Sequence, residues 1–439
     1  MPRCDRPDDS LATVEIRNLL SLPNQLFGAT ESDVVERVTR AEGDVVPFYG
    51  QFAILHTDRE HIWLIRDRLG LNKLFYVMDR DRSLLTVGNS IFEVAAATGD
   101  FNRIASVLPG HFLKISRESH EQELACYYDI SREAAPAVGD FDLADFHQRI
   151  GQRLQEYFTH LDASHPEAIF AVCLSGGLDS TLIATYAKRF LKNVIATTFS
   201  YSIKTRESED FVAARAIAEA LDLEFFPIVK ERRLDEERLK TVLRFCQDWR
   251  DFNVHCAWLN DQVGEALRRR YPDREIIALT GDLMNEYVAD YTPVTYGGVV
   301  YYPQPRISRE RLRRFFVYGL DTSDREIGVF HRHNISVLQP YSVLAEEYLR
   351  VPAAVIEQPQ CKEVLNLPVI SNDRVEALVG RAKTRAQVGG KDGGTLGLFH
   401  DSGISQSVLK TWWDEMFTPF CREGKPREII VSGRYVSAV

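Results

Sequence analysis

The segment from Ala168 to Lys188, which reads AIFAVCLSGGLDSTLIATYAK, constrains the fold of this chain more than any other stretch. It opens with a continuous aliphatic run to Leu174, which is typical of a strand buried on both faces of a parallel sheet. Beyond Asp179 the apolar residues recur at helical spacing. The segment therefore predicts a strand, a tight glycine loop and a helix, an arrangement in which loop N–H groups and the helix N-terminus bind phosphate.

The sequence of the glycine loop is only partly specific for phosphate binding. Tight strand-to-helix turns commonly need glycine for steric reasons alone, so a purely structural turn is the alternative. The loop also lacks the Gly-Lys-Ser/Thr sequence of a Walker A motif. Under the phosphate-binding hypothesis, Asp179 adds a candidate metal ligand and Ser180 a hydroxyl donor at the helix start. The residues expected to meet the nucleotide here are Leu174, Ser175, Gly176, Gly177, Asp179 and Ser180.

Composition limits the classes of function. The chain has 439 residues, long enough for two or three domains. Its net charge of −10 disfavours nucleic-acid binding by a basic face. No apolar stretch approaches the roughly 18 residues of a membrane span, and the N-terminus lacks the layout of a signal peptide. The seven cysteines are scattered without a Cys-x-x-Cys pair, so we expect reduced thiols and a cytoplasmic protein.

Short strands dominate the N-terminal third of the chain. Apolar runs at residues 52–56, 61–65, 74–78 and 84–87 are separated by polar turns. This rhythm predicts an all-β or layered α+β domain, which we place at residues 1–135. The stretch at residues 130–145, with its Ala-Ala-Pro-Ala-Val-Gly sequence, is the expected linker.

The same region resembles the glutaminase domain of class II amidotransferases. The resemblance rests on Gly50–Ile54 (GQFAI), Arg66–Tyr76 (RDRLGLNKLFY) and Leu108–Lys114 (LPGHFLK). It implies an N-terminal nucleophile hydrolase fold, a layered sandwich in which a cysteine exposed by removal of the initiator methionine attacks glutamine. Here position 2 is Pro2 and the nearest cysteine is Cys4, which that removal does not expose. Because the thiol needs its own α-amine for activation, we expect a degenerate domain without glutaminase activity.

Strands and helices are expected to alternate in the second domain, which we place at residues 145–439. Apolar strand runs lie at residues 168–174, 194–199, 225–229 and 276–280. Helical spacing favours helices at residues 146–158, 207–221, 235–247 and 259–269. This alternation predicts a doubly wound parallel sheet with sites at the carboxyl ends of its strands, followed by helical additions. The fold class is therefore α/β and α+β.

Four motifs of this half, taken in order, resemble the asparagine synthetase and β-lactam synthetase family. They are Ser175–Ser180 (SGGLDS), Leu279–Glu286 (LTGDLMNE), the segment Asp321–Tyr341 with its Gln-Pro-Tyr ending, and Arg381–Lys383 (RAK). The resemblance implies an ATP-pyrophosphatase domain that uses ATP and Mg²⁺. Such enzymes cleave ATP between the α and β phosphates, adenylate a carboxylate, and let a nitrogen nucleophile displace AMP.

The resemblance also implies roles for single residues around the nucleotide. Lys383 is expected to contact pyrophosphate and to stabilise the negative charge of the transition state, although a lone lysine in a polar loop is usually only solvated. Ser200, after the second strand, is expected to meet the adenosine, and Gly281 to lie beside the nucleotide. Glu209 and Asp210, farther along, serve equally well as charges at a helix N-terminus.

The expected metal site departs from the family pattern. Asn285 stands where the family has an aspartate that holds magnesium together with the aspartate of the glycine loop. An asparagine ligates magnesium through oxygen but adds no negative charge. Either Asp282 or Glu286 compensates, or Asp179 and the ATP phosphates hold the metal between them.

A second departure concerns the base that activates the nucleophile. In β-lactam synthetases a glutamate and a tyrosine deprotonate the attacking amine, and here Asp282 replaces the tyrosine. Glu326, or Asp324 in a shifted register, matches the glutamate. We expect Asp282 and Glu326 to form a two-carboxylate base, because mutual repulsion raises the pKa of one of them. The substrate-binding candidates are Asp251, His255 and Tyr287.

The sequence thus predicts an ATP-dependent ligase that joins a small-molecule carboxylate to an amine, as in natural-product biosynthesis. An amine is favoured because a degenerate glutaminase supplies no ammonia. The alternatives are a synthetase of the same fold that uses free ammonia, and a non-catalytic homologue, for which Pro2 and Asn285 argue. No nucleic-acid or membrane partner is expected, and the assembly that we consider is a homodimer.

Overall fold

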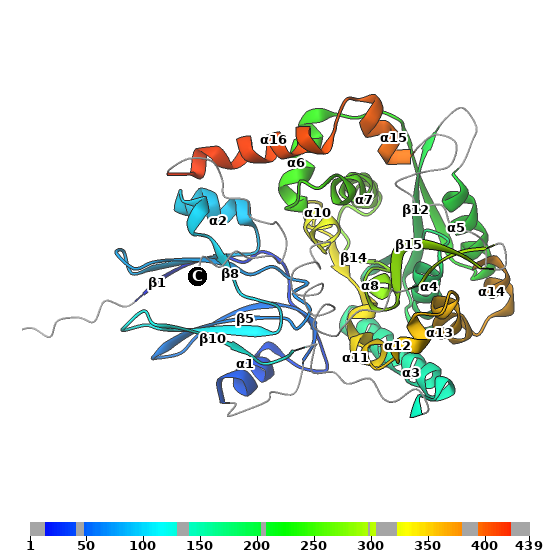
Figure 1. Cartoon of the computed structure of the whole chain (residues 1–439), viewed down its shortest axis with the longest axis horizontal. Helices are drawn as coiled ribbons and strands as arrows, with labels where there is room; N and C mark the ends of the chain where they lie inside the picture. The colour runs from blue at the N-terminus through cyan, green and yellow to red at the C-terminus, as the bar shows by residue number, and fades with distance from the viewer. Residues whose placement is uncertain are drawn as a thin grey trace, which may run out of the picture.

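Two stacked four-stranded sheets form the N-terminal half of the chain in the computed structural model (Figure 1). The structure describes residues 14–40, 48–129, 140–202, 208–296, 299–303, 323–379 and 394–422. One sheet has the order β1-β7-β6-β8 and the other β10-β9-β5-β4. Their strands are β1 (Glu15–Leu19), β4 (Ala53–Thr57), β5 (His61–Arg66), β6 (Phe75–Asp79), β7 (Leu84–Gly88), β8 (Ala105–Ser106), β9 (His111–Ser116) and β10 (Gln122–Cys126).

The side chains of β5 alternate between two apolar clusters, which shows why the two sheets stack. Ile62 and Leu64 point to the core between the two sheets, whereas Trp63 and Ile65 belong to a different apolar cluster on the outer face. On that outer face lies α1 (Glu31–Arg40), which contributes Val34 and Val38 to the same cluster. A second helix, α2 (Ile91–Thr98), covers the other sheet (Figure 1). The expected layered sandwich is therefore present, with a helix outside each sheet.

A five-stranded parallel sheet organises the second half, with the order β13-β12-β11-β14-β17. From β11 (Ile169–Cys173) the chain adds β12 (Val194–Ser202) and β13 (Glu224–Glu231) on one side. It then crosses over to add β14 (Ile276–Leu279) and β17 (Ser336–Leu338) on the other. The order reverses between β11 and β14, and in open parallel sheets ligands bind at the carboxyl ends of the strands beside such a switch point.

Helices and short strands complete the two halves. The N-terminal half adds β2 (Gln25–Phe27), β3 (Tyr49–Gln51) and η1 (Phe101–Arg103). The helices from the chain middle are α3 (Leu143–Ser164), α4 (Leu178–Phe190), α5 (Glu209–Ala220), α6 (Glu236–Cys246), α7 (Asp251–Arg270), α8 (Met284–Val288), η4 (Ser323–Arg325) and α10 (Ile327–His331), with the hairpin β15 (Ala289–Tyr296) and β16 (Val299–Pro303). The later ones are η5 (Pro340–Leu344), α11 (Ala345–Leu349), α12 (Ala353–Ile356), α13 (Cys361–Ile370), α14 (Asp373–Val379), α15 (Gly394–Asp401), α16 (Gln406–Phe417) and η6 (Thr418–Phe420).

Several element boundaries differ from the sequence-based expectation. The helix expected to begin at Leu259 begins at Asp251, and the one expected from Phe146 to Phe158 spans Leu143–Ser164. In α3 the carboxylate of Asp142 caps the helix by accepting hydrogen bonds from the amides of Ala144 and Asp145. The strand expected to end at Phe199 continues to Ser202 because β13 pairs with its full length. Ser200 thus lies within β12 and not after it.

The C-terminal helix α16 packs against both halves of the chain. It runs above α6 and reaches α2 of the N-terminal half (Figure 1). Its Phe417 ring lies 4.5 Å from that of Phe101 and 6.0 Å from that of Phe92, measured between centroids. The two halves therefore share one apolar cluster on this side of the molecule.

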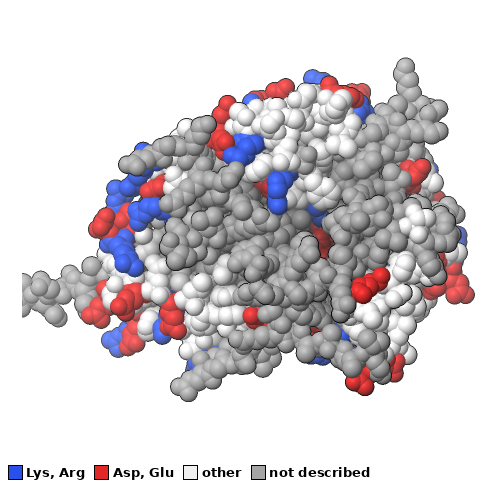
Figure 2. All heavy atoms as spheres, in the orientation of Figure 1, with Lys and Arg blue, Asp and Glu red and all other residues white. Residues whose placement is uncertain are grey.

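Charges are mixed on the face of the molecule shown in Figure 2. Where that face is described, basic and acidic side chains intermingle, and no broad basic patch gathers there. No helix in the described parts of the chain combines the length and the hydropathy that crossing a bilayer requires.

Arg68 forms the main ionic contact between the halves. Its side chain is buried, and its Nη1 donates to Glu346 Oε1 at 2.7 Å and its Nη2 to the carbonyl of Ser342 at 2.8 Å. Its guanidinium also lies 4.2 Å from the ring centroid of Tyr49. The turn at residues 66–68 thus contacts the second half of the chain through Arg68.

Replacing Arg68 with Ala should lower the free energy of unfolding by about 2–4 kcal/mol, because it leaves buried acceptors without their cation. Urea or thermal unfolding measures the change. Arg40 is the matched control, since its ion pair with Glu36 is exposed and its removal should cost less than about 0.5 kcal/mol. Equal destabilisation by the two variants would contradict the assignment of Arg68 as an interface residue.

Candidate active site

The glycine loop after β11 is shaped by close packing against α5. Gly176 has a φ of +74°, and a Cβ on it would lie 2.5 Å from the Cβ of Ala213. A side chain at this position would therefore meet both backbone strain and a steric clash. Leu174, just before the loop, donates its amide to the carbonyl of Thr197 at 2.8 Å, which extends the pairing of β11 with β12. The loop needs glycine for its own conformation, whatever it binds.

Hydroxyl groups fix the start of α4. The amide of Ser175 donates to Ser180 Oγ at 3.2 Å, and the two serine hydroxyls lie 3.1 Å apart. Thr181 Oγ1 donates to the carbonyl of Gly177 at 2.7 Å. Gly177 is the N-cap residue, and no described side chain accepts a hydrogen bond there from the first turn of α4. The helix thus presents its positive end at the loop, as phosphate binding requires.

The loop after β14 approaches the start of α4 closely. A Cβ on Gly281 would lie 2.9 Å from the amide nitrogen of Ser180. Tyr341, which is fully buried, donates its hydroxyl to the carbonyl of Asp179 at 3.2 Å. The structure therefore brings three of the four expected motifs together, and the fourth, with Lys383, lies outside the described residues.

Lys362 lies between the two residues expected to hold a metal. Its Nζ is 2.7 Å from Asp179 Oδ2 and 2.7 Å from Asn285 Oδ1. The second oxygen of Asp179, Oδ1, is buried and has no hydrogen-bond partner among the described residues. Oxygen atoms from a carboxylate and an amide are ligands that Mg²⁺ accepts, and the unpartnered Oδ1 fits a cation. The residues thus fit a magnesium ion, although a lysine ammonium already contacts two of their oxygens.

Asp282 is bound by Arg325 on both carboxylate oxygens. Arg325 Nη2 lies 3.0 Å from Asp282 Oδ1 and 2.9 Å from Oδ2. The arginine side chain is almost fully buried. One arginine nitrogen thus contacts both oxygens, and this ion pair fixes the position of the Asp282 carboxylate.

Glu326 is the most strongly perturbed carboxyl group near the loop. Its Oε2 accepts hydrogen bonds from Thr280 Oγ1 at 2.6 Å and from Gln339 Nε2 at 2.9 Å. Thr280 follows β14 and Gln339 follows β17, so the two neighbouring strand ends hold it. Burial, followed by repulsion from Asp282, raises the pKa of Glu326 to about 8. The two-carboxylate base expected from the sequence stays a prediction.

Two further side chains near these carboxylates, Glu286 and Cys173, also have raised pKa values. Burial and repulsion from Asp282 raise the pKa of Glu286 to about 7. Burial, with Glu326 and Asp282 nearby, raises the pKa of the Cys173 thiol far above neutrality. Cys173 therefore stays protonated and is no nucleophile.

The remaining sequence candidates lie apart from the loop or in the core. Ser200 is buried, and its hydroxyl accepts from the amide of Ser208 at 3.4 Å. His255 packs edge-to-face on Phe399 of α15, with centroids 4.4 Å apart. Tyr287 is buried and donates its hydroxyl to the carbonyl of Tyr341 at 3.2 Å, which makes it a core residue. The side chain of Asp251, at the first position of α7, lies outside the described residues.

Sequence reasoning missed two cations of the site, Lys362 and Arg325. Lys362 lies 183 positions beyond Asp179 and 77 beyond Asn285, and a single lysine in a helix gives no signal of its own. Arg325 had a usable signal, since it directly precedes Glu326 in a segment rich in charges. The sequence places three carboxylates at the site, Asp179, Asp282 and Glu326, and buried carboxylates need nearby cations. A search for such cations would have found Arg325.

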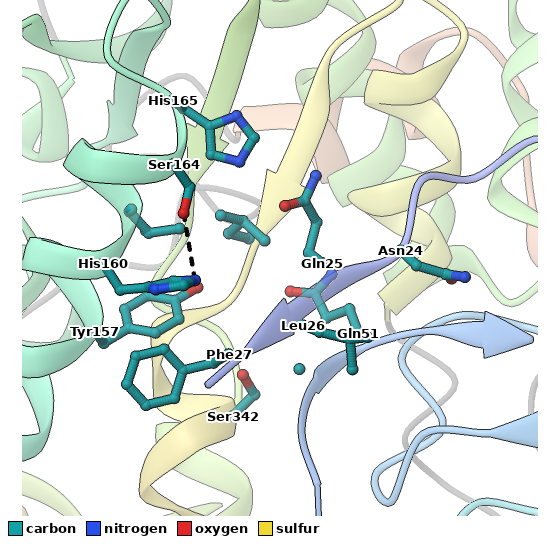
Figure 3. Close-up of a pocket in the computed structure, with 13 residues that line it drawn as sticks. Asn24, Gln25, Leu26, Phe27, Gln51, Tyr157, His160, Ser164, His165 and Ser342 are labelled. Carbon is teal, nitrogen blue, oxygen red and sulfur yellow. Dashed lines mark hydrogen bonds between the residues drawn. The ribbon is translucent and has the colours of Figure 1, made fainter. Parts of the chain in front are cut away.

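A separate pocket of about 250 Å³ opens where the two halves meet (Figure 3). Gln25 and Gln51 line it from the N-terminal half, and His160, Ser164 and His165 from α3. Figure 3 shows the contact between Ser164 Oγ and His160 Nε2, which are 3.3 Å apart. None of the sequence-predicted site residues whose side chains the structure describes lines this pocket, and neither does the Ser175–Ser180 loop.

Comparisons with known proteins agree with the location of this site. The family model for asparagine synthase matches residues 161–258, which contain β11, the Ser175–Ser180 loop and α4. No curated protein matches the sequence.

Solved structures with a likeness to the chain include three synthetases. The NH3-dependent NAD synthetase from Campylobacter jejuni is 16% identical, with 42% of this chain and 77% of that one covered and a TM-score of 0.25. The glutamine-dependent NAD+ synthetase from Acinetobacter baumannii is 18% identical, with coverages of 38% and 29% and a TM-score of 0.22. The NMN synthetase from Francisella tularensis is 15% identical, with coverages of 66% and 100% and a TM-score of 0.23.

Because these identities and TM-scores are low, the fold assignment rests on the sheet order and the loop geometry described above. The family match agrees with both. That match covers residues 161–258, less than a quarter of the chain.

Proposed function

We propose that this protein is an ATP-dependent ligase that adenylates a small-molecule carboxylate and passes the acyl group to an amine. The observation that carries the proposal is the assembly of three motifs at the switch point of the sheet. There the open N-terminus of α4 and the Lys362 ammonium face one region, and residues that follow β14 and β17 hold the buried Glu326. A phosphate cradle beside a carboxyl group of raised pKa is what a two-stage adenylation needs.

In the first stage, a carboxylate oxygen of the substrate attacks the α-phosphorus of ATP, and the bond to the bridging oxygen of pyrophosphate breaks. The loop amides and the N-terminus of α4 bind the pyrophosphate that leaves. Asp179 and Asn285 would hold Mg²⁺, which neutralises phosphate charge when bound. Lys383 is proposed to add a second positive charge from its own loop.

In the second stage, an amine attacks the acyl carbon and AMP leaves. The attacking nitrogen must lose a proton, and Glu326 in its ionised form accepts it. With a pKa of about 8, about one tenth of Glu326 is ionised at pH 7, which matches a base working near neutrality. Burial, followed by repulsion from Asp282, raises this pKa, and Arg325 holds the Asp282 carboxylate in place.

The direct test incubates the protein with Mg²⁺, ATP labelled at the α-phosphate and pools of carboxylic acids. The expected products are AMP and pyrophosphate, with acid-dependent exchange of pyrophosphate into ATP. Arms with ammonium or with amines then decide which nitrogen source is used. Formation of ADP and phosphate would overturn the proposal, and absence of ATP binding by calorimetry would favour the non-catalytic alternative.

The Gly176→Ala variant tests the phosphate cradle. We expect at least about a tenfold loss of ATP affinity, because the added methyl clashes with Ala213 and displaces the loop. Gly403→Ala is the matched control, since Gly403 has nearly the same φ, +73°, and a Cβ there meets nothing within 4 Å. Calorimetry with a non-hydrolysable ATP analogue measures both. Equal losses in the two variants would show that backbone strain alone, and no special loop, explains the effect.

The Glu326→Gln variant tests the base. Amide formation should fall by about 10²–10⁴-fold because the proton acceptor is lost, while pyrophosphate exchange stays within about threefold. In the unaltered protein, amide formation should rise with pH through about 8, since ionisation creates the base. The variant should lose this rise. Unchanged amide formation with intact adenylation would exclude Glu326 as the base, and Glu156→Gln, at an exposed position of α3, is the control.

A further inference from the structure

The position of Lys362 is fixed by its surroundings. It is the second residue of α13, and its carbonyl accepts from Asn366 Nδ2 at 2.8 Å. Asn366 is itself fully buried and contacts the hydroxyl of Tyr348. The preceding Cys361 lies with its Sγ 3.2 Å from the carbonyl of Val288, at the end of α8. The start of α13 is thus tied to the core and to the helix that carries Asn285.

The ammonium of Lys362 contacts one charged and one neutral partner. Asp179 contributes one negative charge, Lys362 one positive charge and Asn285 none, so the three side chains together carry no net charge. An aspartate in place of Asn285 would make the same trio negative. The amide oxygen accepts the lysine hydrogen bond equally well, so the neutral partner suits a lysine better than a divalent ion.

We propose that Lys362 is the resident cation of the Ser175–Ser180 loop, and that Asn285 is its matched partner. The proposal rests on the proposed function, because it assigns the ammonium to the pyrophosphate that leaves ATP. In the nucleotide-free protein the ammonium neutralises Asp179 and repels a divalent ion. Magnesium therefore enters with the ATP phosphates and has no strong site of its own on the free protein.

The same geometry allows the Lys362 ammonium to contact a phosphate oxygen directly. Its side chain is 22% exposed, and its Nζ lies against Asp179 in the first turn of α4, where pyrophosphate is proposed to bind. A lysine is a compact positive charge with three donors, and such a group contacts phosphate readily. The ammonium can turn from Asp179 to a phosphate oxygen and leave both carboxylate oxygens open to the incoming magnesium.

The test measures Mn²⁺ binding to the nucleotide-free full chain by electron paramagnetic resonance, and binding of inorganic pyrophosphate by calorimetry at constant Mg²⁺. Lys362→Met should bind Mn²⁺ at least about tenfold more tightly and pyrophosphate at least about tenfold more weakly. Asn285→Asp, which keeps the lysine, should also strengthen Mn²⁺ binding. Lys410→Met is the control, because Lys410 is similarly exposed and also pairs with an aspartate, on α16.

The outcomes separate this inference from the proposed function. Mn²⁺ affinity that stays unchanged in both Asn285→Asp and a folded Lys362→Met would overturn the role of Lys362, even if the protein makes AMP. If Lys362→Met fails to fold, Asn285→Asp decides alone: tighter Mn²⁺ binding supports the pairing, and unchanged binding refutes it. A protein that shows the Mn²⁺ effects but forms no AMP would keep Lys362 as the resident cation and refute the ligase.

Discussion

The site depends on the close approach of two loops at the point where the order of the parallel sheet reverses. Gly176 lets the first loop lie against α5, and Gly281 lets the second lie against the first turn of α4. A Cβ at either position would push the loops apart. Because Asp179 lies on one of these loops and Asn285 follows the other, that approach also sets the distance that Lys362 spans. Glycine therefore controls the electrostatics of the site through packing, before any ligand is bound.

Buried charge is the second constraint. Asp179, Asp282, Glu286 and Glu326 lie near one another, and Lys362 and Arg325 are the cations that the described contacts place among them. Two positive charges cannot neutralise four carboxylates, so the least solvated ones retain protons more strongly. That is why the raised pKa values fall on Glu286 and Glu326, which are buried, whereas Asp282 is held by an arginine. The raised pKa of these carboxyl groups follows first from burial and then from repulsion by Asp282.

The sequence predicted the local structure around the site but few of the contacts between residues far apart in the chain. Ala168–Lys188 predicted the strand, loop and helix because aliphatic periodicity and glycine act over short distances. The strand ends were less accurate, and Ser200 lies inside β12 because pairing with β13 extends that strand. Lys362 was not predictable at all, since only the folded chain brings α13 beside α4 and α8. Burial was not predictable either: Tyr287, a substrate-binding candidate from the sequence, is buried and donates its hydroxyl to the carbonyl of Tyr341.

The N-terminal half supports the site in a way that does not require a thiol. Gln51 donates to the carbonyl of Val337 and accepts from the amide of Gln339, each at 3.0 Å, and so fixes the end of β17. The side chain of Gln339 in turn donates to Glu326. Lys73, also buried, lies with its Nζ 3.9 Å from Asp324 Oδ2, two residues before Glu326. The segment that carries the candidate base is therefore held from the other half of the chain. These contacts use Gln51 and Lys73, so the N-terminal half holds this segment whatever activity of its own it has.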